Sequence, residues 1–252
     1  LNQLQKVFNL ILDNKHFLNS MNVNYRKKLP TPIIEEKYIP FLDSCSVVME
    51  SPSEEYSIYY TTNGEVPDKN SLIYRNPIVI KDSAKILARS FSIKNNEFSD
   101  PVEIICDKLN YLIPVKAHGV KPGVEVFWQE GSFDKAMNLK IEQMENMKIL
   151  EKVKYPKEDL EEDFSVIYRG FISVSREDIY DFLLQSDDGS VLIINDEMMI
   201  DNDGFHAPYK IMRSFAMRQG IYPFTLKYFL GKGGKDLTFL WRIRGEKEWK
   251  EV

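Results

Sequence analysis

The sequence predicts a mostly β protein with two β-sandwich domains, a small one followed by a larger one, preceded by a short N-terminal helix. Aromatic residues make up 12% of the chain, and large side chains of this kind pack well on the pleated face of a sheet. Several segments alternate apolar and polar residues with the period of two that a strand produces. With 252 residues, the chain is long enough for two domains that each bury a core.

The first 42 residues are expected to form a helix and a linker. An apolar stripe with spacings of three and four lies along one helical face over 1–25, formed by Leu4, Val7, Phe8, Ile11 and Leu12. Pro30 and Pro32 then stop the helix, because proline lacks an N–H donor and restricts the residue before it.

Residues 43–108 read as the small antiparallel sandwich. Short runs with strand periodicity are separated by the turn residues Asn63-Gly64 and Asn95-Asn96. The expected strands are Ser46–Met49, Tyr56–Thr61, Ile78–Ile80, Lys85–Ser92 and Val102–Cys106.

A second linker over 109–123 is indicated by Pro114 and by Lys121-Pro122-Gly123. Residues 124–252 then form the larger domain. Its expected inner faces carry alternating residues, namely Tyr180, Phe182 and Leu184, then Tyr222, Phe224, Leu226 and Tyr228, then Leu237, Phe239, Trp241 and Ile243. The charged stretch from Lys154 to Asp163 is interpreted as a solvated loop without a function.

Charge and hydropathy exclude two classes of partner. A net charge of −5 without a basic stripe argues against nucleic acid, which requires clustered Lys and Arg. No run approaches the roughly 18 apolar residues of a membrane span, and no N-terminal signal is visible. Because the chain starts at Leu1, we expect it to be a piece of a longer protein.

The two cysteines, Cys45 and Cys106, lack metal-ligand spacing. Free thiols are the favoured interpretation. A disulfide stays open at this stage, because terminal strands of a small sandwich can be neighbours.

The small domain contains the stretches "YYTTNGEVPDKNSLIYRNPIVI" and "AKILARSF". With them it resembles the C-terminal fibronectin type III-like domain of chitobiases and β-hexosaminidases. Its turn matches at Tyr60, Thr61, Asn63, Gly64 and Pro67. The resemblance implies a spacer more than a binding site.

The larger domain contains the stretches "YRGFISVSREDIYDFLLQSDDGSVLIINDEMMIDNDGFH", "GIYPFTLKYF" and "LTFLWRI". With them it resembles the lectin-like domain named after the protective antigen of anthrax toxin. The resemblance implies a β-sandwich or barrel that recognises carbohydrate. The expected ligand is a hexosamine-containing glycan, or else a polysaccharide of host or dietary origin.

A helix placed before the small domain resembles the end of a glycoside hydrolase family twenty barrel. This arrangement implies a non-catalytic accessory region of a secreted, periplasmic or cell-surface bacterial enzyme similar to β-N-acetylhexosaminidase, with the catalytic domain upstream as a partner. No Gly-x-Ser-x-Gly elbow, phosphate loop or His-Glu-x-x-His motif is present. We therefore expect no catalytic residues in the chain.

The candidate carbohydrate-binding residues follow strand ends, where rigid elements present polar loops to solvent. They are Asp187, Asp188, Asn202, Asp203 and His206. No cofactor is expected to be required. In fungal adhesins of the resembling family an Asp-Asp pair binds calcium, so Asp187 and Asp188 are the expected ligands if calcium binds, whereas bacterial members often keep the Asp-Asp-Gly turn without an ion. Calcium takes six to eight hard oxygen ligands.

Two alternatives stay open. Asp188 could accept backbone N–H bonds within its own turn while Asp187 faces solvent, and Asp201, Asn202 and Asp203 could be turn formers. The domains would then brace a catalytic barrel and bind no free ligand; a remnant catalytic function is a third possibility.

Stacking on a sugar ring requires an aromatic side chain. Trp128, Phe205, Tyr209 and Trp249 are eligible, whereas Trp241 lies in an alternating strand and is expected to be buried.

Overall fold

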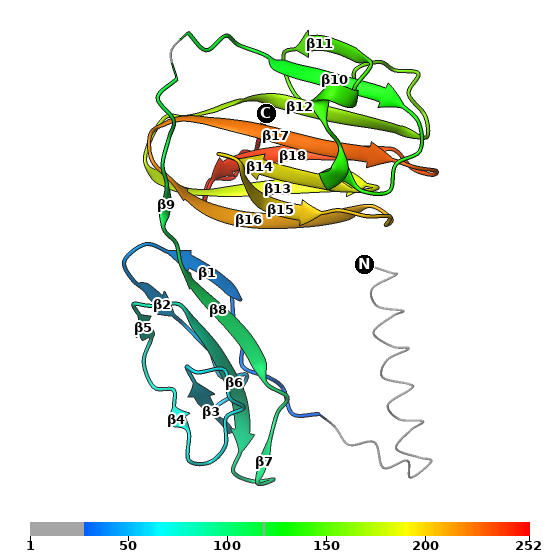
Figure 1. The fold of residues 1–252 in the computed structure, drawn as a ribbon. Coiled ribbons are helices and arrows are strands. Elements are labelled where there is room, and N and C mark those ends of the chain that lie inside the picture. The colour runs from blue at the N-terminus through cyan, green and yellow to red at the C-terminus, as the bar shows by residue number, and fades with distance from the viewer. Residues whose placement is uncertain (1–27, 118) are drawn as a thin grey trace, which may run out of the picture. The chain divides into compact units, whose positions relative to one another are not determined.

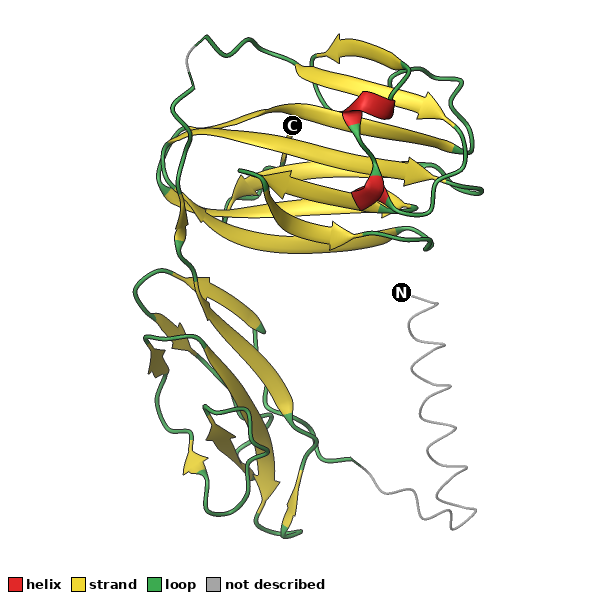
Figure 2. Cartoon of the chain, viewed as in Figure 1, coloured by secondary structure: helices red, strands yellow, loops and turns green. Residues whose placement is uncertain are grey.

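The computed structural model describes residues 28–117 and 119–252, so the helix predicted over 1–25 lies outside the described residues. Two compact units are present (Figure 1): one contains the described residues up to Ile39 together with Ser46–Cys106, and the other contains Pro40–Cys45 and Asp107–Val252. Strands dominate both units (Figure 2). The mostly β sandwich fold is therefore confirmed, while the domain limits 43–108, 109–123 and 124–252 stay predictions.

The first unit is built on a six-stranded sheet in the order β1-β8-β6-β3-β4, with β7 paired to β6, and a two-stranded sheet of β2 and β5. One end each of β1, β2 and β8 belongs to the second unit. The strands are β1 (Tyr38–Phe41), β2 (Cys45–Val47), β3 (Tyr56–Thr61), β4 (Leu72–Ile73), β5 (Ile78–Ile80), β6 (Ala84–Ser92), β7 (Glu97–Phe98) and β8 (Val102–Lys108).

The bounds predicted from alternation agree with the observed bounds of β3 and β5, and the predicted start of β6 differs from the observed start by one residue. On these strands Ile58, Ile86 and Ile104 are buried, as residues on the inner face of a pleated strand are expected to be. Cys45 is half-buried on β2 and Cys106 is buried on β8. The redox state of the two thiols stays a prediction.

The second unit contains two sheets. Six strands run in the order β11-β10-β12-β17-β14-β15, and five run in the order β19-β18-β13-β16-β9. Their bounds are β9 (Tyr111–Leu112), β10 (Val124–Glu130), β11 (Asn146–Leu150), β12 (Phe164–Val174), β13 (Asp178–Asp187), β14 (Ser190–Ile194), β15 (Glu197–Asn202), β16 (Tyr209–Met217), β17 (Gly220–Leu230), β18 (Asp236–Ile243) and β19 (Lys250–Glu251).

The core of this unit lies between the inner faces of the two sheets. Most of the side chains predicted to face inward are fully buried, including Phe182 on β13 and Tyr222, Phe224, Leu226 and Tyr228 on β17. Leu237 and Trp241 are half-buried and pack against the same cluster. The period-two pattern therefore identified the core faces, because consecutive strand residues point to opposite sides of a sheet.

A second, smaller core lies on the outer face of the six-stranded sheet. The segment between β10 and β11 forms two short 3-10 helices, η1 (Ala136–Asn138) and η2 (Ile141–Gln143). Its apolar side chains cover one end of the sheet, and the cluster is formed by Ala136, Leu139, Ile167, Val191 and Phe229. The rest of this outer face is not covered by that segment.

Part of the predicted linker over 109–123 is a strand. Tyr111–Leu112 form β9, which pairs with Ala216 and Met217 of β16, and Val115 forms a bridge to Ile221. These residues are therefore paired with strands of the second unit, while the linker limits 109–123 stay a prediction. Prolines marked the segment as irregular, but a two-residue strand completed by a distant partner leaves no periodic signal in its own sequence.

Candidate functional site

Asp187 and Asp188 lie at the end of β13, in the tight connection to β14. Asp187 is the last residue of β13 and pairs with Asp236 of β18. The peptide bond between Asp187 and Asp188 is cis. Three connections meet here: the one that carries the aspartates, the one from β15 to β16, and the one from β17 to β18.

The Asp188 carboxylate fastens these connections to one another. Its Oδ1 accepts a hydrogen bond from the His206 amide at 3.1 Å, and its Oδ2 accepts one from the Gly231 amide at 3.0 Å. The sequence suggested acceptance of N–H bonds within its own turn, but both donors come from other connections. Hydrogen bonds from amides to a buried carboxylate are strong, so Asp188 acts as a structural clamp.

The Asp187 carboxylate is in a different position. The residue is only 7% exposed, which argues against the alternative in which Asp187 faces solvent. Among the described residues no group donates a hydrogen bond to its carboxylate, whereas its main-chain carbonyl accepts one from Oη of Tyr228 at 2.6 Å. Burial, and then the neighbouring charge of Asp188, raise the pKa of Asp187. A buried carboxylate of this kind is unfavourable without a compensating cation or donor.

Asn202 is hydrogen-bonded to residues near the aspartates. It is buried at the end of β15, and its Nδ2 donates to Oγ of Ser186 at 2.8 Å and to the carbonyl of Tyr209 at 3.2 Å. Ser186 in turn lies 2.7 Å from Oγ of Ser190. The prediction placed Asn202 in a solvent-exposed turn, and this was wrong because these partners hold it inside. None of the described residues donates to its Oδ1.

Asp203 is engaged with backbone donors. Its oxygens accept hydrogen bonds from the amides of Ala136 at 2.6 Å and Met137 at 3.1 Å, at the start of η1, and from Gly204 at 2.9 Å. This carboxylate therefore fixes the η1 segment to the site and has little capacity left for a ligand.

His206 and two eligible aromatics lie on the same connection. The His206 ring is half-buried, with Nε2 2.9 Å from the carbonyl of Asn202 and Nδ1 2.9 Å from that of Ala207. Phe205 is 63% exposed and Tyr209 is 59% exposed, and the Phe205 ring meets Phe229 edge-on at 5.3 Å. Two exposed aromatic rings therefore flank the aspartates.

The other eligible aromatics have structural contacts. Trp128 is half-buried against the main core, and Trp249 lies under the guanidinium of Arg242 at 4.3 Å. Packing accounts for both.

Within the described residues, no group of three or more His, Cys, Asp and Glu side chains is arranged to hold a metal ion. Oxygens at this end that accept no hydrogen bond from the described residues include those of the Asp187 carboxylate and Oδ1 of Asn202. The four hollows of the described residues that have the best-defined linings do not include Asp187 or Asp188.

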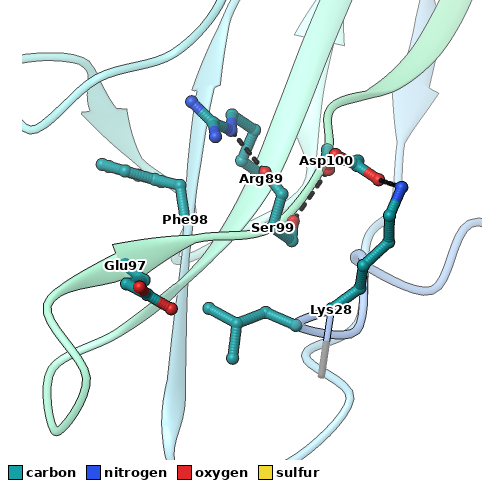
Figure 3. A pocket seen from close by; sticks show the side chains of 7 residues that line it. Lys28, Arg89, Glu97, Phe98, Ser99 and Asp100 are labelled. Atoms are coloured by element: carbon teal, nitrogen blue, oxygen red, sulfur yellow. Dashed lines mark hydrogen bonds and ion pairs between the residues drawn. The ribbon is translucent and has the colours of Figure 1, made fainter. Parts of the chain in front are cut away.

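A hollow of about 480 Å³ lies in the first unit, lined by Lys28, Leu29, Arg89, Glu97, Phe98, Ser99 and Asp100 (Figure 3). Its polar groups already have partners. Arg89 donates to the carbonyls of Ser99 and Pro67, and Lys28 pairs with Asp100 at 2.6 Å. This hollow offers a ligand no unsatisfied group, so the second unit holds the better candidate.

Two family models match the chain. One, described as the PA14 domain, matches residues 120–250, which is just over half of the chain. The chain belongs to the PA14 domain family. The other model, described as the chitobiase/beta-hexosaminidase C-terminal domain, matches residues 41–102. Both resemblances stated from the sequence are confirmed, and both models describe accessory rather than catalytic domains.

Solved structures of similar fold are distant. The PA14 domain of the antifreeze protein MpAFP is 12% identical with a TM-score of 0.44, covering 55% of this chain and 90% of its own. The A domain of epithelial adhesin 9 from Candida glabrata, in complex with Galβ1-3GlcNAc, is 10% identical with a TM-score of 0.44, covering 56% and 92%.

The GH31 α-xylosidase of Xanthomonas citri is 14% identical with a TM-score of 0.39, covering 81% of this chain and 24% of its own. No curated protein sequence is similar enough to match.

Sequence reasoning missed three residues that build the site in the PA14 domain. Ser186 and Tyr228 hold the backbone beneath the aspartates, and Gly231 provides an amide to Asp188. Ser186 adjoins the Asp-Asp-Gly motif and could have been singled out by that position. Tyr228 was identified only as a core residue. Alternation predicts that a side chain is buried, but it does not predict the hydrogen-bond partner of its hydroxyl group.

Proposed function

We propose that the PA14 domain binds a glycan at the end of the sandwich that carries Asp187 and Asp188, with calcium held there by the Asp187 carboxylate. The observation that carries the proposal is that Asp187 is buried and has no hydrogen-bond donor among the described residues. Burial, and then the neighbouring charge of Asp188, raise its pKa. A cation would supply a counter-charge.

The oxygens of the site suit calcium. Calcium prefers hard oxygens from carboxylates, amide carbonyls and water, and those of Asp187 and Oδ1 of Asn202 are of this kind, with Asp188 beside them. When bound, calcium would neutralise the carboxylates and give sugar hydroxyls an ion to coordinate. Two protein ligands and their neighbour leave several positions for water or sugar.

The remaining site residues have separate roles. Asp188 and Asp203 fix the connections, so the ligand-binding groups are held in place before a sugar arrives. Phe205 and Tyr209 are exposed and can cover the apolar face of a pyranose ring, while His206 can hydrogen-bond a hydroxyl.

Affinity should be low. Each hydroxyl exchanges water for protein at a net gain of about 1 kcal/mol. A few such bonds correspond to a Kd of about 1 mM.

At the level of the whole protein, the proposal is a non-catalytic accessory region of a secreted, periplasmic or cell-surface glycoside hydrolase resembling β-N-acetylhexosaminidase. The match to the chitobiase/beta-hexosaminidase C-terminal domain beside the PA14 domain supports this role. In the described part of the chain, no helix is long and apolar enough to cross a membrane.

The test is a printed glycan array that includes hexosamine-containing glycans and Galβ1-3GlcNAc, probed in calcium and in EDTA. We expect wild-type binding that requires calcium and is lost in Asp187→Asn, a variant that keeps the shape of the side chain. Asp159→Asn is the matched control, because its side chain is 81% exposed and distant in sequence from the site.

Calcium-dependent binding that survives in a folded Asp187→Asn protein would remove this residue from the site. Absence of any calcium-dependent glycan binding by the wild type would favour the bracing role.

A further inference from the structure

The outer face of the six-stranded sheet carries an exposed aromatic residue outside the η1 and η2 segment. Phe171 lies on β12 and is 46% exposed, between the exposed neighbours Arg169 and Ser173 of the same strand. Two hollows, of about 380 and 240 Å³, both include Gly123 and Phe171 in their linings. The two hollows therefore adjoin at these two residues, and together they are called the groove, with Phe171 shared by its two halves.

The first half combines an apolar floor with a fixed polar pair. Phe171, Pro223 and Ile149 contribute the apolar surface. Arg169 pairs with Glu125 through Nε and Oε2 at 2.8 Å, and its guanidinium lies 5.5 Å from the centre of the Phe127 ring. These contacts hold the planar guanidinium of Arg169 and the carboxylate of Glu125 in fixed positions. The guanidinium keeps donors, and the carboxylate keeps acceptors, that can bond to hydroxyl groups.

The second half adds another aromatic side chain and more polar groups. Trp241, Ser173 and Glu251 line it, and Glu251 forms an ion pair with Lys152. Here β12 also runs beyond its neighbour, since the β10–β12 pairing ends at Glu125 and Arg169 while β12 continues to Val174. The backbone of 170–174 therefore borders the groove without a β10 partner.

Charge at the groove is balanced. The lining contains two basic side chains, Lys121 and Arg169, and three acidic ones, Glu125, Glu151 and Glu251. Lys152, the ion-pair partner of Glu251, makes the numbers equal. Such a surface neither attracts nor repels a charged ligand strongly at long range. The combination of ring-sized apolar surface, fixed polar groups and no net charge fits a neutral polyol.

The groove is separate from the Asp187 end. Phe164 of β12 pairs with Leu230, the residue before the Gly231 that donates to Asp188. Phe171 lies seven residues farther along β12, or about 23 Å at the rise of a strand. One glycan residue cannot occupy both places.

We propose that this groove is a second carbohydrate-binding site, which takes a neutral, linear oligosaccharide across Phe171 and does not require calcium. Its total volume is in the range of ligand-binding sites, and its two halves extend on either side of one aromatic ring. A sugar unit stacks on Phe171 while its neighbours hydrogen-bond to Arg169, Glu125 and Ser173.

The test measures binding of the whole chain in EDTA, which removes any calcium-dependent binding. The printed ligands are neutral linear oligosaccharides of one to six units of glucose or N-acetylglucosamine, other neutral linear glycans, and sialylated glycans. We expect binding of neutral chains that strengthens with length. Phe171→Ala should weaken it about tenfold, while Phe171→Trp retains it. Met147→Ala is the matched control, because Met147 is exposed on the same sheet and does not line the groove.

Equal melting temperatures of the variants would show that binding, and not folding, has changed. No binding of any neutral oligosaccharide in EDTA, a preference for sialylated glycans, or unchanged binding by Phe171→Ala would each overturn the proposal. The Asp187→Asn variant should bind in EDTA as the wild type does, so failure at either site is recognised separately.

Discussion

Replacing Gly189 by alanine is expected to destabilise the PA14 domain by about 3 kcal/mol, at the upper end of the usual cost of overpacking. A Cβ atom at Gly189 would lie 2.3 Å from Cε1 of Phe229, 2.7 Å from the amide nitrogen of Gly204 and 2.8 Å from Oδ1 of Asp203. The amide nitrogen is backbone and the carboxylate is held by three amides, so neither contact relaxes easily. The melting temperature should fall by about 6–12 °C.

Gly245→Ala is the control for this change. Gly245 has a φ of +85° and nothing within 4 Å of a built Cβ, so only the conformational cost of about 1–2 kcal/mol applies. If Gly189→Ala lost no more stability than Gly245→Ala in calorimetry, the close packing around the aspartates would be contradicted.

A loss of about 3–5 kcal/mol is expected for Asp181→Ala, because a buried ion pair that loses one partner leaves uncompensated charge. Asp181 is 1% exposed on β13. Its carboxylate accepts from Oγ of Ser214 at 2.7 Å, from Nη1 of Arg244 at 2.8 Å and from Arg242 at 3.3 Å. Without it, the guanidinium groups of Arg242 and Arg244 lose the carboxylate that they share.

Urea unfolding would measure this loss, with Ser214→Ala as the comparison. Ser214→Ala removes one hydrogen bond and should cost about 1 kcal/mol. Similar costs for the two variants would contradict the assignment of Asp181 as the counter-charge for both arginines.

Much of the fold followed from the sequence because alternation is a local signal. The strands with Phe182 and Tyr228 were predicted from a period of two, and their burial confirms it. The PA14 resemblance also brought Asp187, Asp188 and Asn202 to one end of a sandwich, where the structure has them.

The roles of the two aspartates could not be predicted, because they depend on distant partners. Local turn chemistry gave Asp188 an acceptor role within its own turn and left Asp187 in solvent. The donors to Asp188 instead come from His206 and Gly231, 18 and 43 residues away. The same applies to Asp203, whose partners at η1 precede it by more than sixty residues. Only the packed connections show which carboxylate is left without a donor.

The central claim is that the buried Asp187 carboxylate requires a cation. Because its pKa is raised in the folded protein, its ionised form opposes folding when no cation is bound. That penalty is absent below the unfolded pKa, grows as the pH rises from the unfolded to the folded pKa, and is fully present above the folded pKa. A bound cation reverses this effect. A free ligand concentration of about 100 times Kd stabilises the folded protein by about 2.7 kcal/mol.

The most direct measurement is thermal unfolding of the wild type and Asp187→Asn at neutral pH, in EDTA and in calcium. The account predicts that Asp187→Asn is the more stable protein in EDTA, and that calcium raises the melting temperature of the wild type by about 5–10 °C and leaves that of the variant unchanged. A wild-type melting temperature that does not respond to calcium, or an equal response in the variant, would contradict it.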